Sequence, residues 1–152
     1  MNALALDLDG VLGDTRPLWL DWVTDVSRRT RVDLDLPGDR AEAARVLDET
    51  MGNWQPLLER FAEDRAPVHF RPDARVSAAL RRLQADGVRI GVFTDGPEAL
   101  ARIALAHCGA ERRIETLETG ANALNRLLDQ LGAGTRTVLT KEELIAASEV
   151  VS

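Results

Sequence analysis

The first twelve residues constrain this chain most, because a short apolar strand ends there in two closely spaced carboxylates and a glycine. Residues 4–12 read Leu-Ala-Leu-Asp-Leu-Asp-Gly-Val-Leu, which puts Asp7 and Asp9 one residue apart and Gly10 after them. Side chains alternate along a strand, so we expect both carboxylates to face the same side. Two such acids repel each other unless a cation or a shared proton lies between them. The pattern favours a nucleophile, an acid/base and a metal at one point, with Gly10 leaving room for a ligand.

Closely spaced acids before a glycine also occur in calcium-binding loops, in nucleotide-binding turns and in ordinary turns. An EF-hand loop is excluded, because alignment on Gly10 puts Ala5 at the first ligand position and Arg16 where the glutamate belongs. A dinucleotide-binding fingerprint is excluded, because Gly10 and Gly13 do not complete G-x-G-x-x-G. An ordinary turn stays open, since Asp and Gly often follow a strand for local reasons.

The rest of the chain divides into a helical section and an alternating section. Between about residues 16 and 65 the apolar spacing predicts helices alone, beginning near Pro17, after Asp39 and after Asn53. Beyond Asp73 the expected elements are a helix, a strand at 88–93, a helix after Pro97, a strand at 114–117, a helix at 121–131, a strand at 135–139 and a helix at 141–149. This alternation predicts an α/β fold with a parallel sheet and helices on both faces.

The segment Asp7-Leu8-Asp9-Gly10-Val11-Leu12 resembles the first motif of the haloacid dehalogenase (HAD) superfamily, most of whose members are phosphatases. The layout is similar too, and implies a three-layer α/β/α Rossmann-like core with strand order 4-1-2-3 and a small all-helical cap inserted after strand one. The implied domains are a core of residues 1–14 and 70–152 and a cap of residues 15–69. By resemblance, Asp7 is the nucleophile and Asp9 the acid/base. Both would hold Mg²⁺, Asp9 through its backbone carbonyl.

A second segment, residues 92–96, reads Val-Phe-Thr-Asp-Gly and resembles the second HAD motif. The resemblance implies that the Thr94 hydroxyl binds a phosphate oxygen, helped by the next backbone N–H groups, at Asp95 and Gly96. The helix N-terminus that follows is a natural anion site. Arg16, at the hinge into the cap, is a further candidate for substrate contact. A solvated or structural arginine is the alternative there.

The last third departs from the family pattern. The third motif normally carries a lysine, but residues 118–124 read Glu-Thr-Gly-Ala-Asn-Ala-Leu. The fourth motif normally ends a strand with metal-binding acids, but residues 138–143 read Val-Leu-Thr-Lys-Glu-Glu. Lys141, the only lysine of the chain, is therefore a candidate catalytic replacement, and Glu142 or Glu143 a candidate Mg²⁺ ligand. The alternative is that these residues only begin the final helix, with Thr140 as its N-cap.

Composition argues against several function classes. A formal net charge of -6 argues against nucleic acid as a partner. No apolar run reaches the roughly 18 residues of a membrane span, and no basic-then-apolar leader is present. The single cysteine, Cys108, cannot form an internal disulfide and is expected to pack in the core. We therefore expect a cytoplasmic protein.

The leading hypothesis is a Mg²⁺-dependent phosphohydrolase acting on a small phosphorylated metabolite of the phosphoglycolate kind. We expect it to be slow, because a missing lysine and a missing acid weaken stabilisation of the transferring phosphoryl group. The alternative is a catalytically degenerate HAD fold that binds a phosphorylated metabolite or a protein partner. A homodimer is a further partner expectation, because the family's fifth strand is missing and leaves a sheet edge. An unrelated α/β domain, with Asp7 and Asp9 only in a turn, is the third hypothesis.

Overall fold

The central sheet of the protein has four parallel strands in the order β3-β2-β1-β4. The computed structural model describes residues 2–151. The strands are β1 (Ala3–Asp7), β2 (Arg89–Thr94), β3 (Thr116–Thr119) and β4 (Thr135–Val138). This is the predicted order read from the opposite edge. Leu6 of the inner strand β1 lies opposite Val92 and Val138, so the carboxyl ends of β1, β2 and β4 meet at one edge.

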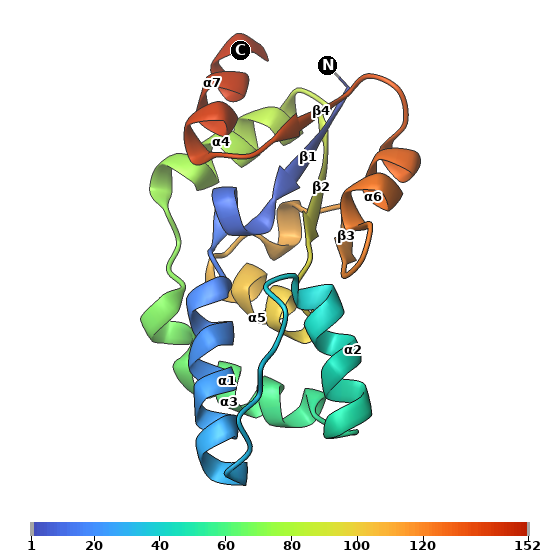
Figure 1. Ribbon diagram of the computed structural model, residues 1–152. Coiled ribbons are helices and arrows are strands. Elements are labelled where there is room, and N and C mark those ends of the chain that lie inside the picture. Colours follow the sequence, from blue (N-terminus) through green and yellow to red (C-terminus); the bar gives the residue numbers. More distant parts are fainter. Residues whose placement is uncertain (1, 152) are drawn as a thin grey trace.

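Helices cover both faces of the sheet, as predicted (Figure 1). They are α4 (Ala74–Ala85), α5 (Glu98–His107), α6 (Ala123–Leu131) and α7 (Lys141–Val151). The small residues Ala3 and Ala5 pack with Leu127 and Leu131 of α6, whereas Leu4 belongs to the main core to which the other three helices contribute. Strict alternation along β1 thus sends a small-residue face to α6 and a leucine face to the opposite layer.

The three helices of the expected cap are α1 (Arg16–Thr30), α2 (Arg40–Thr50) and α3 (Gln55–His69), and they extend beyond the carboxyl ends of the strands (Figure 1). Its three tryptophans are buried and touch one another. The ring centroids are 5.4 Å apart for Trp19 and Trp22, and 5.7 Å for Trp22 and Trp54. Trp54 also donates a hydrogen bond of 2.7 Å to Asp48. The prediction that the tryptophans form the core of the cap is confirmed.

The cap is not packed separately from the sheet. Trp22 of α1, Leu58 of α3 and Leu6 of β1 belong to one continuous cluster of buried residues. The domain boundaries expected after residues 14 and 69 stay a prediction.

Three local expectations are wrong. The strand β1 ends at Asp7 and is followed by one π-helical turn, Leu8–Leu12, so Asp9 is not on the strand and alternation does not orient it. Helix α3 begins at Gln55 without a side-chain cap, so Asn53 does not cap it. The third strand lies two residues later than expected. Each error concerns a boundary, where local hydrogen bonding rather than apolar spacing decides.

Other expectations about helix ends are confirmed. The Asp39 carboxylate accepts from the backbone N–H groups of Ala41 and Glu42, and Asp73 caps α4 in the same way.

Within residues 2–151, no helix combines the length and apolar character needed to cross a membrane.

Candidate active site

A cleft of about 530 Å³ opens at the carboxyl ends of β1 and β2. Asp7, Asp9, Arg16, Thr94 and Asp95, all predicted site residues, line it together. The cap adds Gly38 and Asp39, and residues 120–124, which run from the loop after β3 into the first turn of α6, complete the lining. The parallel sheet therefore brings the two motifs, 85 residues apart, into one cleft, as ligand sites of open α/β sheets require.

Asp7 ends β1, and its Oδ1 accepts a hydrogen bond of 3.2 Å from the Asp9 N–H. Burial raises the pKa of Asp7 above its ordinary value, and the charge of Asp9 raises it further. Ionised Asp7 is thus held at an unfavourable potential. A cation at this carboxylate would relieve that potential.

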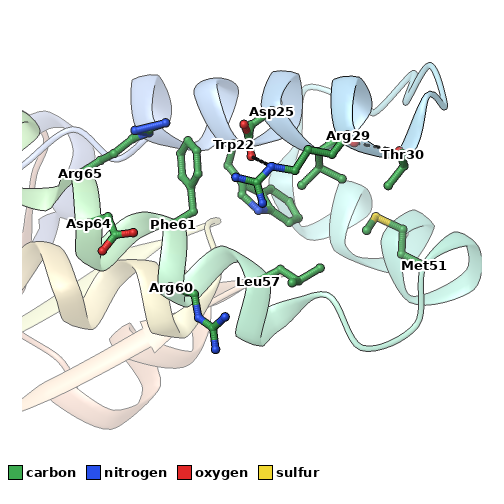
Figure 2. Close-up of a pocket in the computed structure, with 11 residues that line it drawn as sticks. Trp22, Asp25, Arg29, Thr30, Met51, Leu57, Arg60, Phe61, Asp64 and Arg65 are labelled. Atoms are coloured by element: carbon green, nitrogen blue, oxygen red, sulfur yellow. Dashed lines mark hydrogen bonds and ion pairs between the residues drawn. The ribbon is translucent and has the colours of Figure 1, made fainter.

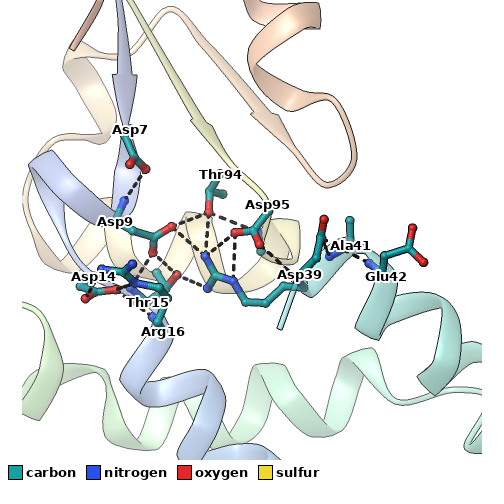
Figure 3. Close-up of polar contacts among 12 residues, drawn as sticks. Asp7, Asp9, Asp14, Thr15, Arg16, Asp39, Ala41, Glu42, Thr94 and Asp95 are labelled. Atoms are coloured by element: carbon teal, nitrogen blue, oxygen red, sulfur yellow. Dashed lines mark hydrogen bonds and ion pairs between the residues drawn. The ribbon is translucent and has the colours of Figure 1, made fainter. Parts of the chain in front are cut away.

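Asp9 is fully engaged by the protein itself (Figure 3). Its Oδ1 accepts from the N–H and hydroxyl of Thr15, at 2.9 and 2.6 Å. Its Oδ2 accepts from Thr94 Oγ1 at 2.8 Å and from Arg40 Nη2 at 2.7 Å. A carboxylate has about four acceptor positions, and all of them are used here. The side chain is 8% exposed, so these bonds replace water.

Arg40 is the residue of this network that sequence reasoning missed. It is the first residue of α2 and is buried. Besides Asp9, its guanidinium donates to Thr15 at 2.6 Å, to Thr94 at 3.1 Å, and twice to Asp95, at 3.1 and 2.8 Å. A cation at a helix N-terminus opposes the helix dipole. An arginine directly after the predicted cap Asp39 was therefore the available signal.

The second motif is held by the same network. Thr94 is buried; its hydroxyl donates to Asp9 and accepts from the Gly96 N–H at 3.2 Å. Although burial alone would raise the pKa of Asp95, hydrogen bonds from Arg40 lower it below its ordinary value. A Cβ at Gly96 would lie 2.9 Å from Arg40 Cζ, so glycine lets the guanidinium pack against this turn.

Arg16 lines the cleft but is tied to a neighbour. Its Nε and Nη2 donate to the two oxygens of Asp14 at 2.8 and 2.9 Å. This side-chain hydrogen bond raises the pKa of Arg16, and its side chain is largely exposed. Its charge also lowers the pKa of Asp7, although less than burial raises it. Arg16 thus stands at the mouth of the cleft as a solvated cation.

The residues after β4 lie outside this cleft. Lys141 Nζ lies 3.3 Å from Asp73, and its side chain is exposed. It lines another cleft, of about 330 Å³, which Asp9 also borders. Thr140 Oγ1 accepts from the Glu143 N–H at 3.2 Å, the capping contact expected if these residues begin the final helix. The catalytic role of Lys141 stays a prediction.

The fit of Mg²⁺ to this site depends on Asp7. Across residues 2–151, no group of three or more Asp, Glu, His or Cys side chains is arranged to hold a metal ion. Glu142 is exposed on the first turn of α7, and the Asp9 carboxylate is occupied by its four donors. Mg²⁺ is often held by one or two carboxylates and several waters. Asp7, whose pKa burial raises, is the carboxylate that fits such an ion.

Gly10 is the residue of the first motif that the loop after β4 approaches closely. A Cβ at Gly10 would collide with the carbonyl oxygen of Leu139 and lie 3.3 Å from Asp7 Oδ2. Glycine therefore lets the π-helical turn pass next to the end of β4. Its predicted part in substrate binding stays a prediction.

A different cavity lies within the cap. It measures about 230 Å³, and Trp22, Leu57 and Phe61 supply its apolar surface (Figure 2). Arg29 pairs with Asp25 at 3.0 Å on its rim. None of the predicted site residues lines it.

Cys108 serves the core. It is buried, its thiol donates to the Leu12 carbonyl at 3.2 Å, and burial raises the pKa of the thiol. A buried thiol with a raised pKa is unreactive. The prediction that Cys108 packs in the core is confirmed.

No model of a known protein family matches the sequence, and no curated protein matches it. Solved structures do match the fold. CbbY from Rhodobacter sphaeroides, in complex with phosphate, is 13% identical with a TM-score of 0.69, and the match covers 98% of this chain and 83% of CbbY. A protein described as a β-phosphoglucomutase from Thermotoga maritima is 18% identical with a TM-score of 0.58, covering 98% of this chain and 82% of that one. The β-phosphoglucomutase of Clostridium difficile is 12% identical with a TM-score of 0.56, covering 97% and 81%. These likenesses confirm the expected HAD-like fold class.

Proposed function

We propose that this protein is a phosphohydrolase of the HAD superfamily that hydrolyses a small phosphomonoester through an aspartyl-phosphate on Asp7. The observation that carries the proposal is the convergence of Asp7, Asp9 and Thr94, from two distant motifs, in one cleft at adjacent strand ends. A cleft of about 530 Å³ suits a small metabolite. The fold shared with a phosphate complex and with phosphoglucomutases supports the same class of chemistry.

The proposed reaction has two steps. A carboxylate oxygen of Asp7 attacks phosphorus, the bond from phosphorus to the leaving oxygen breaks, and Asp9 donates a proton to that oxygen. A water then attacks phosphorus, Asp9 takes its proton, and inorganic phosphate leaves with Asp7 regenerated. Thr94 holds a phosphoryl oxygen during both steps by turning towards it the hydroxyl hydrogen that the structure directs at Asp9. Mg²⁺ held by Asp7, and by the Asp9 backbone carbonyl that the resemblance implies, would lower the repulsion between Asp7 and the phosphate dianion. Glu142 lies outside this cleft, and its part as a ligand stays a prediction from the sequence.

The second candidate is a protein that binds a phosphorylated metabolite without turnover. Two observations favour it. Asp9 is occupied by four internal donors, and no three-residue metal cluster is formed within the part of the chain that the structure describes. Such a protein would retain phosphate affinity while lacking the proton transfer that hydrolysis needs.

Hydrolysis of an aryl phosphate, with Mg²⁺ or with EDTA, separates the two candidates. The wild type is compared with Asp7→Asn, and with Asp33→Asn as a control at an exposed acidic residue of the cap. The proposal expects metal-dependent phosphate release that Asp7→Asn abolishes and Asp33→Asn preserves. Folded wild-type protein without turnover on this probe and on a panel of small phosphates would favour the binding protein.

A further inference from the structure

We propose that Arg40 is the positioning residue of this site: carried by the cap, it compensates the charge of Asp9 from outside the substrate cleft and thereby takes the place of the third-motif lysine that residues 118–124 lack. This inference rests on the proposed function, because it assumes that the cleft receives a phosphoryl group. It extends that function because the catalytic centre would then consist of core residues together with one arginine from the cap.

The cleft needs such a charge. Four aspartates line it, Asp7, Asp9, Asp39 and Asp95, against one arginine, Arg16. Arg16 directs its guanidinium at Asp14 and is largely exposed. A phosphate dianion approaching this lining meets a strong excess of negative charge, and opposing charges cost most where water is excluded.

Arg40 answers this need without touching the cleft. It borders a different cleft, formed by α1 and residues 34–38, of about 390 Å³. Its side chain is buried, and its Nη2 lies 2.7 Å from Asp9 Oδ2 and 2.8 Å from Asp95 Oδ1. A buried guanidinium at this distance offsets the field of both carboxylates, because little water lies between them.

The same guanidinium also directs the two groups that act on the substrate. Nη2 donates to Thr94 Oγ1 at 3.1 Å, so the Thr94 hydroxyl keeps its own hydrogen for an acceptor, here Asp9. Nη1 donates to Thr15, whose hydroxyl in turn donates to Asp9 Oδ1. Arg40 thus fixes the orientation of Asp9 through both carboxylate oxygens.

Asp95 is a second carboxylate that pairs with Arg40. It accepts from the Arg40 backbone N–H at 3.1 Å and from the guanidinium, yet its side chain is 45% exposed. It therefore draws on the charge of Arg40 while adding a negative charge to the cleft lining. Removing that negative charge leaves more of the arginine's field for an incoming phosphate.

The test compares charge with hydrogen bonding at one position. Arg40→Lys keeps the charge and loses the planar fork, whereas Arg40→Gln keeps a donor and loses the charge. Arg29→Gln is the matched control, an exposed cap arginine that also pairs with an aspartate. Affinity for inorganic phosphate with Mg²⁺ present is measured by calorimetry, and kcat/KM with an aryl phosphate, after circular dichroism shows each variant folded.

We expect Arg40→Gln to lose about tenfold or more in both readouts, in keeping with the strength of charge-assisted contacts. Arg40→Lys should lose markedly less, Arg29→Gln should match the wild type, and Asp95→Asn should bind phosphate several-fold more tightly. Rescue by Arg40→Lys is the readout that a merely structural ion-pair network would not produce, since such a network depends on the planar fork that lysine lacks. The rise with Asp95→Asn follows from removing one negative charge from the lining of the cleft.

Equal values for Arg40→Gln and Arg40→Lys, or weaker phosphate binding in Asp95→Asn, would overturn the inference while leaving a measurable phosphohydrolase intact. If phosphate affinity falls in Arg40→Gln and is largely kept in Arg40→Lys, while the wild type does not hydrolyse the ester, the inference about Arg40 would be supported and the proposed reaction overturned. Absence of phosphate binding by the wild type would overturn the inference outright.

Discussion

Arg40 and Lys141 both place a positive charge near the first motif, but one charge is buried and the other is exposed. Both border clefts next to the first motif, but the Arg40 side chain is 3% exposed with two carboxylates as partners, and Lys141 is 46% exposed with one. Lys141 is the cation that the sequence suggested. Arg40 is the cation that the fold delivers, because the start of α2 lies over the ends of β1 and β2. The comparison teaches that burial of a cation next to the carboxylates, rather than its position near a sequence motif, decides how strongly its charge acts on the site.

The largest expected effect on stability comes from removing the buried cation, Arg40. Arg40→Met should lower the free energy of unfolding by roughly 3–5 kcal/mol, because removal of one partner leaves buried Asp9 uncompensated. Denaturant unfolding at neutral pH measures it. A loss near zero would show that Asp9 finds other partners and would remove the basis of the contrast.

The second effect tests how tightly the first motif is pressed against β4. Gly10→Ala should cost roughly 1–3 kcal/mol, because its Cβ collides with the Leu139 carbonyl, a backbone group that cannot turn away cheaply. Gly38→Ala is the control, since no atom lies within 4 Å of a Cβ built there. Thermal unfolding of the two variants compares them, and equal melting temperatures would contradict the close approach.

The third effect concerns Asp7 and has the opposite sign. Asp7→Asn should raise the free energy of unfolding in EDTA by less than about 1 kcal/mol, because burial penalises the charge and solvent screens a half-exposed group. The native pKa of Asp7 is raised above 3.8, so the penalty is absent below pH 3.8, grows as the pH rises from 3.8 to the native pKa, and is fully present above it. Unfolding measured at neutral pH and near pH 3 checks both parts. A gain that persists at low pH would point to packing instead of charge.

The smallest effect lies at the exposed end of the contrast. Lys141→Ala should change the free energy of unfolding by about 0–1 kcal/mol, as exposed ion pairs do. The same denaturant series as for Arg40 measures it. Because Asp73 also caps α4, the Asp73→Ala variant is combined with Lys141→Ala in a double-mutant cycle, which isolates the contribution of the ion pair. A loss comparable to that of Arg40→Met would mean that Lys141 is anchored in the site after all.

The sequence predicted the architecture well, because the strand and helix periods are strong and the two motifs stand at strand ends. It placed Asp7, Asp9 and Thr94 in one cleft for the right topological reason, although the π-helical turn, and not strand alternation, orients Asp9. Arg40 escaped prediction because its role depends on where α2 comes to lie over the sheet, which is a tertiary property that local patterns do not encode.

Trapping the phosphorylated carboxylate tests most directly whether Asp7 is the nucleophile. Asp9→Asn removes the base of the second step, so a donor with a good leaving group, such as 4-nitrophenyl phosphate, should leave a phosphoryl group on Asp7. Acid quenching followed by mass spectrometry of the peptide that carries Asp7 detects it. We predict one phosphoryl group on that peptide, absent from the Asp7→Asn/Asp9→Asn double variant. Phosphate release by the wild type, with no such adduct in any folded variant, would contradict Asp7 as the nucleophile.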